Sequence, residues 1–277
     1  MKKILPWILT VMITLFAAVF QRLTGPSYPL RGNVIVQEKE ISYRLPRTHE
    51  STSNCPVTIQ TETPEIRGIL RFRRFKTDDP WTERNMVYRA GALASELPRQ
   101  PAAGKLEYMV TLHYDGKRHT LSEKGPIVIR FKDPVPLALL IPHVFIMFLA
   151  MLFSTRSGLE ALDPKGNTRP YVFLTFVFLA CGGMILGPLV QKFAFGALWT
   201  GFPLGSDLTD TKTLIAFLGW LIAFIVVILR KPARVWVLAA SLLLLIVYLI
   251  PHSLLGSELD YSRISSAVTP AEKIIGS

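Results

Sequence analysis

The amino-acid sequence predicts a membrane α-helical bundle of about five transmembrane helices with an inserted all-β extracytoplasmic domain, an immunoglobulin-like sandwich. Half of the 277 residues are hydrophobic and only 18% are charged. The apolar residues gather into nearly uncharged runs of about 20 residues, the length that a helix needs to cross a bilayer. Between the first run and the others, apolar and polar residues alternate as in half-buried strands. This composition excludes a disordered chain, and two cysteines exclude a disulfide-stapled scaffold.

The predicted spans are residues 4–20, 135–153, 171–190, 213–229 and 235–255. The first follows Lys2 and Lys3 and lacks the small residues of a signal-peptidase site, so residues 1–22 are predicted to be an uncleaved signal anchor. The remaining four spans would form a transmembrane domain over residues 134–256.

The orientation follows from the short connections that are rich in lysine and arginine, because such connections stay in the cytoplasm. They contain Lys2, Lys3, Arg156, Lys165, Arg169, Arg230, Lys231 and Arg234. We therefore expect a cytoplasmic N-terminus in a bacterial inner membrane, with residues 23–133 and the C-terminal tail, residues 257–277, in the periplasm. These topological charges explain much of the net charge of +11, so no nucleic-acid partner is predicted.

Residues 23–133 are predicted to contain about seven short strands. Asp115-Gly116 lies between two alternating stretches and predicts a tight hairpin. Cys55 is expected to stay unpaired, because Cys181 lies within a predicted span. The proline-rich residues 97–104 predict a surface loop, with docking of a partner as the alternative. The basic residues of one strand predict a solvated face or a contact with anionic headgroups; they are Arg71, Arg73, Arg74 and Lys76.

Two histidines in the predicted spans suggest an alternative redox function. His143 and His252 each follow a proline in the outer half of a span, and neutral imidazoles on two helices can bind the iron of haem b. Their expected depths differ by about one helical turn, which argues against a haem pair. In the other interpretation, each imidazole binds the carbonyl that its neighbouring proline leaves free. No cofactor is therefore the first expectation.

Weak candidates for a metal site lie at the outer rim: Asp207, Asp210, Glu258 and Asp260. Their spacing is not diagnostic of any metal. A carboxylate among residues 206–212 can instead cap the N-terminus of the following span.

Other features suggest contacts rather than chemistry. The outer segment of residues 191–212 contains Trp199 and Phe202 and suits a helix in the headgroup layer or a re-entrant turn. Gly183 and Gly187 have the spacing that allows close helix packing, and Gly187-Pro188 predicts a kink. A small-molecule or ion path near His143 and this kink is a further alternative.

No Walker loop, dinucleotide fingerprint, metalloprotease motif or nucleophile elbow occurs, so the sequence leans away from an enzyme. The first functional prediction is a non-catalytic protein whose periplasmic sandwich binds other envelope proteins, as a subunit or assembly factor of a complex.

Overall fold

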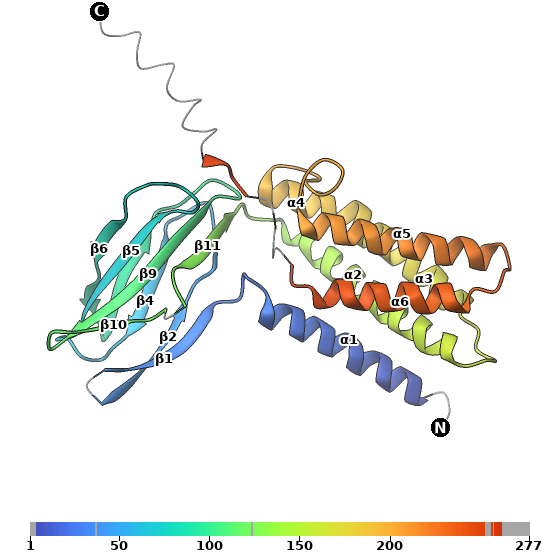
Figure 1. Cartoon of the computed structure of the whole chain (residues 1–277), viewed down its shortest axis with the longest axis horizontal. Helices are drawn as coiled ribbons and strands as arrows, with labels where there is room; N and C mark the ends of the chain where they lie inside the picture. Colours follow the sequence, from blue (N-terminus) through green and yellow to red (C-terminus); the bar gives the residue numbers. More distant parts are fainter. Residues whose placement is uncertain (1–3, 37, 123, 253–255, 257, 262–277) are drawn as a thin grey trace, which may run out of the picture. The chain divides into compact units, whose positions relative to one another are not determined.

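The structure of the chain is a computed structural model that describes residues 4–36, 38–122, 124–252, 256 and 258–261. It has a mixed architecture of helices and sheets (Figure 1). The described residues form two compact units. The helical unit comprises those up to residue 26 and from 135 to 256, and the β unit comprises residues 27–134 and 258–261.

Four helices of the described chain are long and apolar enough to cross a membrane. The helical unit consists of α1 (Ile4–Thr24), α2 (Leu137–Leu162), α3 (Arg169–Leu179), the π-helix η1 (Ala180–Leu186), α4 (Gly187–Phe195), α5 (Leu208–Ile228) and α6 (Arg234–Leu249). The elements α3, η1 and α4 form one continuous helix, Arg169–Phe195. With 16 residues, α6 is shorter than a typical span, so a fifth crossing remains a prediction.

The π-helix lies where the sequence predicts a kink. Pro188 has no N–H to donate to the carbonyl four residues earlier. The N–H of Gly187 instead donates to the carbonyl of Gly182, five residues earlier, in the π register. A Cβ on Gly182 would lie 2.8 Å from the Sδ of Met147, and one on Gly183 would lie 3.0 Å from Thr213. These glycines therefore let α2 and α5 approach η1 closely.

The position of Arg156 corrects one prediction. The sequence analysis placed it in a connection between two spans, but α2 continues to Leu162 and Arg156 is only 6% exposed. Its guanidinium lies 4.7 Å from the ring centre of Tyr171 and 5.4 Å from that of Trp7. It also pairs with Glu160 one turn later, at 2.5 Å. Two aromatic rings and a carboxylate thus stabilise a buried charge that the sequence suggested would be solvated.

Small residues dominate the interior of the helical unit. The buried cluster that contains the indole of Trp220 includes Ala17, Ala150, Ala161, Ala216, Ala223 and Ala240. Small side chains let neighbouring helices pack closely, which is the main source of helix association in a bilayer.

The β unit contains eleven described strands: β1 (Leu30–Val36), β2 (Lys39–Leu45), β3 (Thr48–Glu50), β4 (Cys55–Gln60), β5 (Arg67–Arg74), β6 (Thr82–Asn85), β7 (Val87–Arg89), β8 (Ala92–Leu97), β9 (Lys105–Tyr114), β10 (Lys117–Thr120) and β11 (Ile127–Lys132). The largest sheet has the order β3-β11-β9-β5-β6, and β10 also pairs with β9. A second sheet has the order β4-β8-β7, and β1 pairs with β2 alone. The sequence did not predict the short strands β3, β6, β7 and β8.

Side chains from all three sheets share one hydrophobic core. In β4 the alternation is complete, because Cys55, Val57 and Ile59 are buried and the residues between them are exposed. Burial raises the pKa of the Cys55 thiol to about 12, and Cys55 is unpaired as predicted. The hydroxyl of Tyr108 donates to the carbonyl of Pro46 at 2.8 Å, so the one large polar side chain of this core has a partner.

The predicted hairpin at Asp115-Gly116 is confirmed. It joins β9 to β10, with Tyr114 opposite Lys117. Asp115 has φ of 46° and Gly116 has φ of 71°, the left-handed values of a two-residue turn that matches the twist of the strands.

Candidate functional site

The two aspartates at the start of α5 hold the preceding loop in place. Asp207 caps the helix by accepting the N–H of Thr209 at 2.7 Å. One carboxylate oxygen of Asp210 accepts the N–H groups of Thr200 at 2.7 Å and Gly201 at 3.0 Å. Both aspartates are only 7% exposed. We call this set of five residues, completed by Thr200, Gly201 and Thr209, the loop cluster.

Helix α4 occupies the first part of the predicted segment, up to Phe195. Residues 196–207 form bends and turns that are bound to the first turn of α5. A re-entrant turn and a position in the headgroup layer both stay predictions. The indole N–H of Trp199 donates to the carbonyl of Phe202 at 3.0 Å, and Phe202 itself is 63% exposed. An interaction with lipid or protein through Phe202 remains a prediction.

The metal prediction gains no support from this arrangement. Among the described residues, no group of three or more histidine, cysteine, aspartate or glutamate side chains could hold a metal ion. Asp207 and Asp210 belong to the helical unit, whereas Glu258 and Asp260 belong to the β unit.

Lys212 lies one turn after the capping aspartate and is 3% exposed. Its ammonium donates to the carbonyls of Val247 at 3.2 Å and Ile250 at 2.5 Å. The last carbonyls of a helix lack partners within that helix, and a cation there compensates them. Lys212 therefore joins the start of α5 to the end of α6.

His143 is half-buried and its Nδ1–H donates to the carbonyl of Gly182 at 3.1 Å. The accepting carbonyl thus belongs to Gly182 of the π-helix η1. It is not the α2 carbonyl that lacks an N–H donor because of Pro142. The Nδ1 atom of His252 lies 3.4 Å from the side-chain amide nitrogen of Gln21. The donation from Nδ1 leaves Nε2 of His143 available as a ligand, so haem binding by the two histidines stays a prediction.

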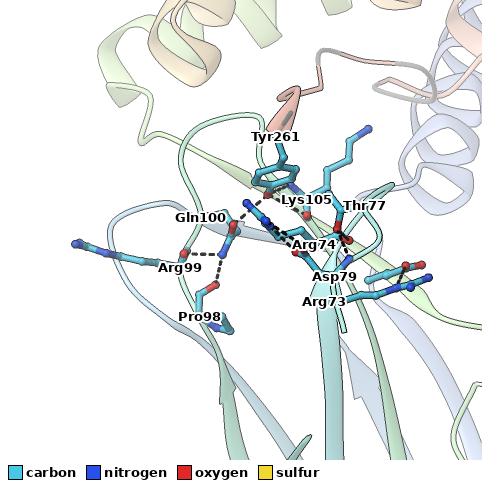
Figure 2. Close-up of polar contacts among 10 residues, drawn as sticks. Arg73, Arg74, Thr77, Asp79, Pro98, Arg99, Gln100, Lys105 and Tyr261 are labelled. Carbon is cyan, nitrogen blue, oxygen red and sulfur yellow. Dashed lines mark hydrogen bonds and ion pairs between the residues drawn. The ribbon is translucent and has the colours of Figure 1, made fainter. Parts of the chain in front are cut away.

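A second polar cluster lies in the β unit and involves residues that are distant in the sequence. We call residues 258–261 the docked segment. The N–H of Leu259 donates to the carbonyl of Ala103 at 3.1 Å. The hydroxyl of Tyr261 accepts the N–H of Lys105 at 2.9 Å and lies 3.0 Å from the side-chain oxygen of Gln100 (Figure 2).

Cations flank the docked segment on the side of β5. The guanidinium of Arg74 lies 5.2 Å from the ring centre of Tyr261 and forms a bidentate pair with Asp79 at 2.5 and 2.9 Å (Figure 2). The carboxylate of Glu258 pairs with Lys105 at 2.8 Å and Lys76 at 3.2 Å. Three cations of β5, its following turn and β9 thus surround the segment.

The electrostatics of this cluster follow from these contacts. The hydrogen bonds from Arg74 hold the pKa of Asp79 below its usual value. Burial by itself would raise the pKa of Glu258, but Lys105 and Lys76 outweigh burial and lower it. Burial raises the pKa of Tyr261 to about 12, so its phenol is neutral and able to donate at neutral pH.

An open pocket of about 540 Å³ adjoins the docked segment; we call it the Arg74 pocket. The turn after β5 supplies one wall and the docked segment supplies the other. Its lining consists of Arg74, Phe75, Lys76, Thr77, Asp78, Asp79, Glu258, Leu259, Asp260 and Tyr261.

The sequence analysis identified parts of this site but not their association. Residues 97–104 were predicted to be a surface loop or a docking site, and the loop between β8 and β9 receives residues 259 and 261. The basic residues of β5 and the following turn were predicted to form a solvated face or a contact with anionic headgroups. Arg71 and Arg73 flank the ring of Trp81 and remain partly exposed, and Arg73 pairs with Glu107. Tyr261 was not singled out, because no local pattern links it to Lys105.

Comparisons with known protein families, with curated proteins and with solved structures gave no match for this chain.

Proposed function

We propose that this chain is a multi-pass protein of a bacterial inner membrane and that its β unit, an immunoglobulin-like sandwich in the periplasm, binds other proteins. Its role would be non-catalytic, as a subunit or assembly factor of an envelope complex. The observation that carries the proposal is the docked segment, because the β unit already holds a short, sequence-distant piece of chain.

The contacts of the docked segment are those by which proteins recognise peptides. The main-chain N–H of Leu259 donates to the carbonyl of Ala103 in the loop. The hydroxyl of Tyr261 accepts the N–H of Lys105, and the carboxylate of Glu258 pairs with two lysines. Main-chain hydrogen bonds supply affinity in such contacts, while side-chain sockets and charges supply specificity. The Arg74 pocket beside the segment leaves room for a further side chain. We therefore place the partner's contact at this pocket and at residues 98–104.

Site-specific photo-cross-linking in native membranes tests this proposal. A photo-reactive amino acid at position 78, which is exposed at the Arg74 pocket, should yield one discrete cross-linked product, identifiable by mass spectrometry. The same amino acid at position 117, which is exposed on β10 of the same unit, serves as the control. Equal yields at both positions, or no product at either, would contradict a specific partner at this site.

Labelling of introduced cysteines tests the proposed topology separately. Lys117→Cys should react with a membrane-impermeant maleimide in intact spheroplasts, whereas Lys165→Cys should react only after lysis. The native Cys55 should contribute little background, because its thiol is buried and its pKa is about 12. The reverse pattern would place the β unit in the cytoplasm.

The haem alternative makes a distinct prediction. The hydrogen bond of His143 uses Nδ1, so Nε2 is the atom that could bind iron. Protein purified from haem-replete cells should then show a Soret band that His143→Ala and His252→Ala each abolish. A colourless preparation would reject this alternative.

A further inference from the structure

A cavity of about 600 Å³ opens in the helical unit between the start of α3 and the end of α5. Its volume lies within the range of about 300 to 1,000 Å³ that is common for small-molecule sites. The lining residues are Arg169, Pro170, Phe173, Leu174, Phe224, Val227, Ile228 and Arg230. We call it the inner cavity.

Most of the wall is apolar. Phe173 and Phe224 face each other with ring centres 6.2 Å apart, and Leu174, Val227 and Ile228 extend the apolar surface. The continuous helix Arg169–Phe195 and α5 are both long and apolar enough to cross a membrane, and in the proposed topology the wall would face hydrocarbon chains. An aliphatic chain therefore suits this wall better than a polar solute.

Both charged residues of the lining are arginines. Arg169 is the first residue of α3, and Arg230 lies two residues after the end of α5. Arg230 has φ of 54°, and its N–H donates to the carbonyl of Val227, which turns the chain back at the end of the helix. Within the part of the chain that the structure describes, neither side chain belongs to an ion pair.

We propose that the inner cavity binds an anionic phospholipid, with an acyl chain along the apolar wall and the phosphate between Arg169 and Arg230. Guanidinium groups bind phosphate oxygens through paired, charge-assisted hydrogen bonds, which makes arginine well suited to this contact. Basic pockets between transmembrane helices bind anionic headgroups in this way. In the proposed topology both arginines lie at the cytoplasmic leaflet. The inference requires the helices to cross a bilayer, but it does not depend on any partner of the β unit.

Thermal unfolding of the detergent-purified full chain tests the lipid class. Phosphatidylglycerol should raise the melting temperature in a saturable way, whereas phosphatidylcholine with the same acyl chains should not. Inorganic phosphate is the third arm of the experiment. If it raised the melting temperature as much as phosphatidylglycerol did, the site would be a simple anion site and the lipid proposal would be wrong.

Paired charge variants test the two arginines. The double variant Arg169→Gln/Arg230→Gln should bind phosphatidylglycerol at least about tenfold more weakly. The loss of a single charged hydrogen bond to the phosphate is expected to weaken binding by about tenfold. The matched control Lys165→Gln/Lys231→Gln removes the same number of charges from the same two connections, at residues outside the cavity lining. Equal losses in both double variants would show a general charge effect and overturn the proposed site.

Val227→Trp tests the apolar wall with both arginines retained. The indole should fill the cavity and weaken phosphatidylglycerol binding while the melting temperature without lipid stays near that of the parent. Unchanged lipid affinity in this variant would contradict an acyl chain along Val227. Native mass spectrometry of each variant supplies the bound lipid mass as an independent measurement.

Discussion

The loop cluster of the helical unit and the docked segment of the β unit each fix an irregular piece of chain, but through different kinds of contact. Both use acidic and hydroxyl groups. In the loop cluster, Asp207 and Asp210 bind main-chain N–H groups from within about ten residues. In the β unit, Glu258 and Tyr261 contact residues more than 150 positions earlier and leave an open pocket beside them.

The role of a carboxylate therefore depends on the hydrogen-bond donors that it faces. The sequence analysis grouped Asp207, Asp210 and Glu258 as weak metal candidates because all were expected at the outer rim. Buried main-chain donors make Asp210 part of the loop's structure, whereas two lysines make Glu258 an attachment point. The loop cluster thus uses its carboxylates to hold its own main chain, and the docked segment adjoins the pocket at which we propose a partner's contact.

The largest effect is expected for the loop cluster. Asp210→Ala should lower the free energy of unfolding of the helical unit by about 2 to 4 kcal/mol, because two buried N–H groups lose their acceptor. Asp210→Asn keeps one oxygen that can accept both, so its effect should be less than half as large. Thermal unfolding in detergent and proteolysis within residues 196–206 measure both. Equal stability of Asp210→Ala and the parent would mean that the carboxylate is not needed to hold the loop.

A smaller effect is expected for Tyr261→Phe. The variant removes the acceptor for the Lys105 N–H, so the docked segment should be released roughly fivefold more often, about 1 kcal/mol. Hydrogen exchange of residues 98–105 should rise while exchange in β4 and β8 stays unchanged. Tyr114→Phe, on the same strand as Lys105, is the matched control and should leave residues 98–105 protected. Increased exchange throughout the β unit would instead indicate a general loss of stability.

The docked segment should also respond to acid. The pKa of Glu258 lies below its usual value of 4.5 in the folded state, so its pairing contributes fully above that value. The contribution should fall as the pH drops from 4.5 through the lower folded pKa. Hydrogen exchange of the same residues between pH 6 and 3, corrected for intrinsic rates, measures it. Glu258→Gln should remove most of this pH dependence, and an unchanged pH profile in that variant would assign the response to another carboxyl group, Asp79 first.

The smallest effect is expected at the hairpin that joins β9 to β10. Gly116→Ala should destabilise the β unit by roughly 1 kcal/mol, because φ of 71° is unfavourable for any residue with a Cβ. An added Cβ would meet nothing within 4 Å, so the effect is conformational only. Chemical unfolding measures it, and the docked segment should keep its protection.

Several parts of the molecule were predictable because short-range rules decide them. Apolar runs identify the four long helices, since length and hydropathy suffice for that inference. Alternation and a favourable turn pair identify the hairpin of β9 and β10. The strands β3, β6, β7 and β8 were not predicted because they have few residues and weak alternation. All four residues of β6, for example, are exposed.

Local patterns in the sequence show where the chain is apolar enough to cross a bilayer, where apolar and polar residues alternate, and which connections are basic. These properties depend on neighbouring residues, so each segment can be interpreted separately. The three-dimensional packing was needed to find that Arg156 is buried beside two aromatic rings, that the hydroxyl of Tyr261 binds Lys105, and that Arg169 and Arg230 line one cavity. Each of these pairs joins residues far apart in the chain, and their association depends on packing that no local pattern encodes.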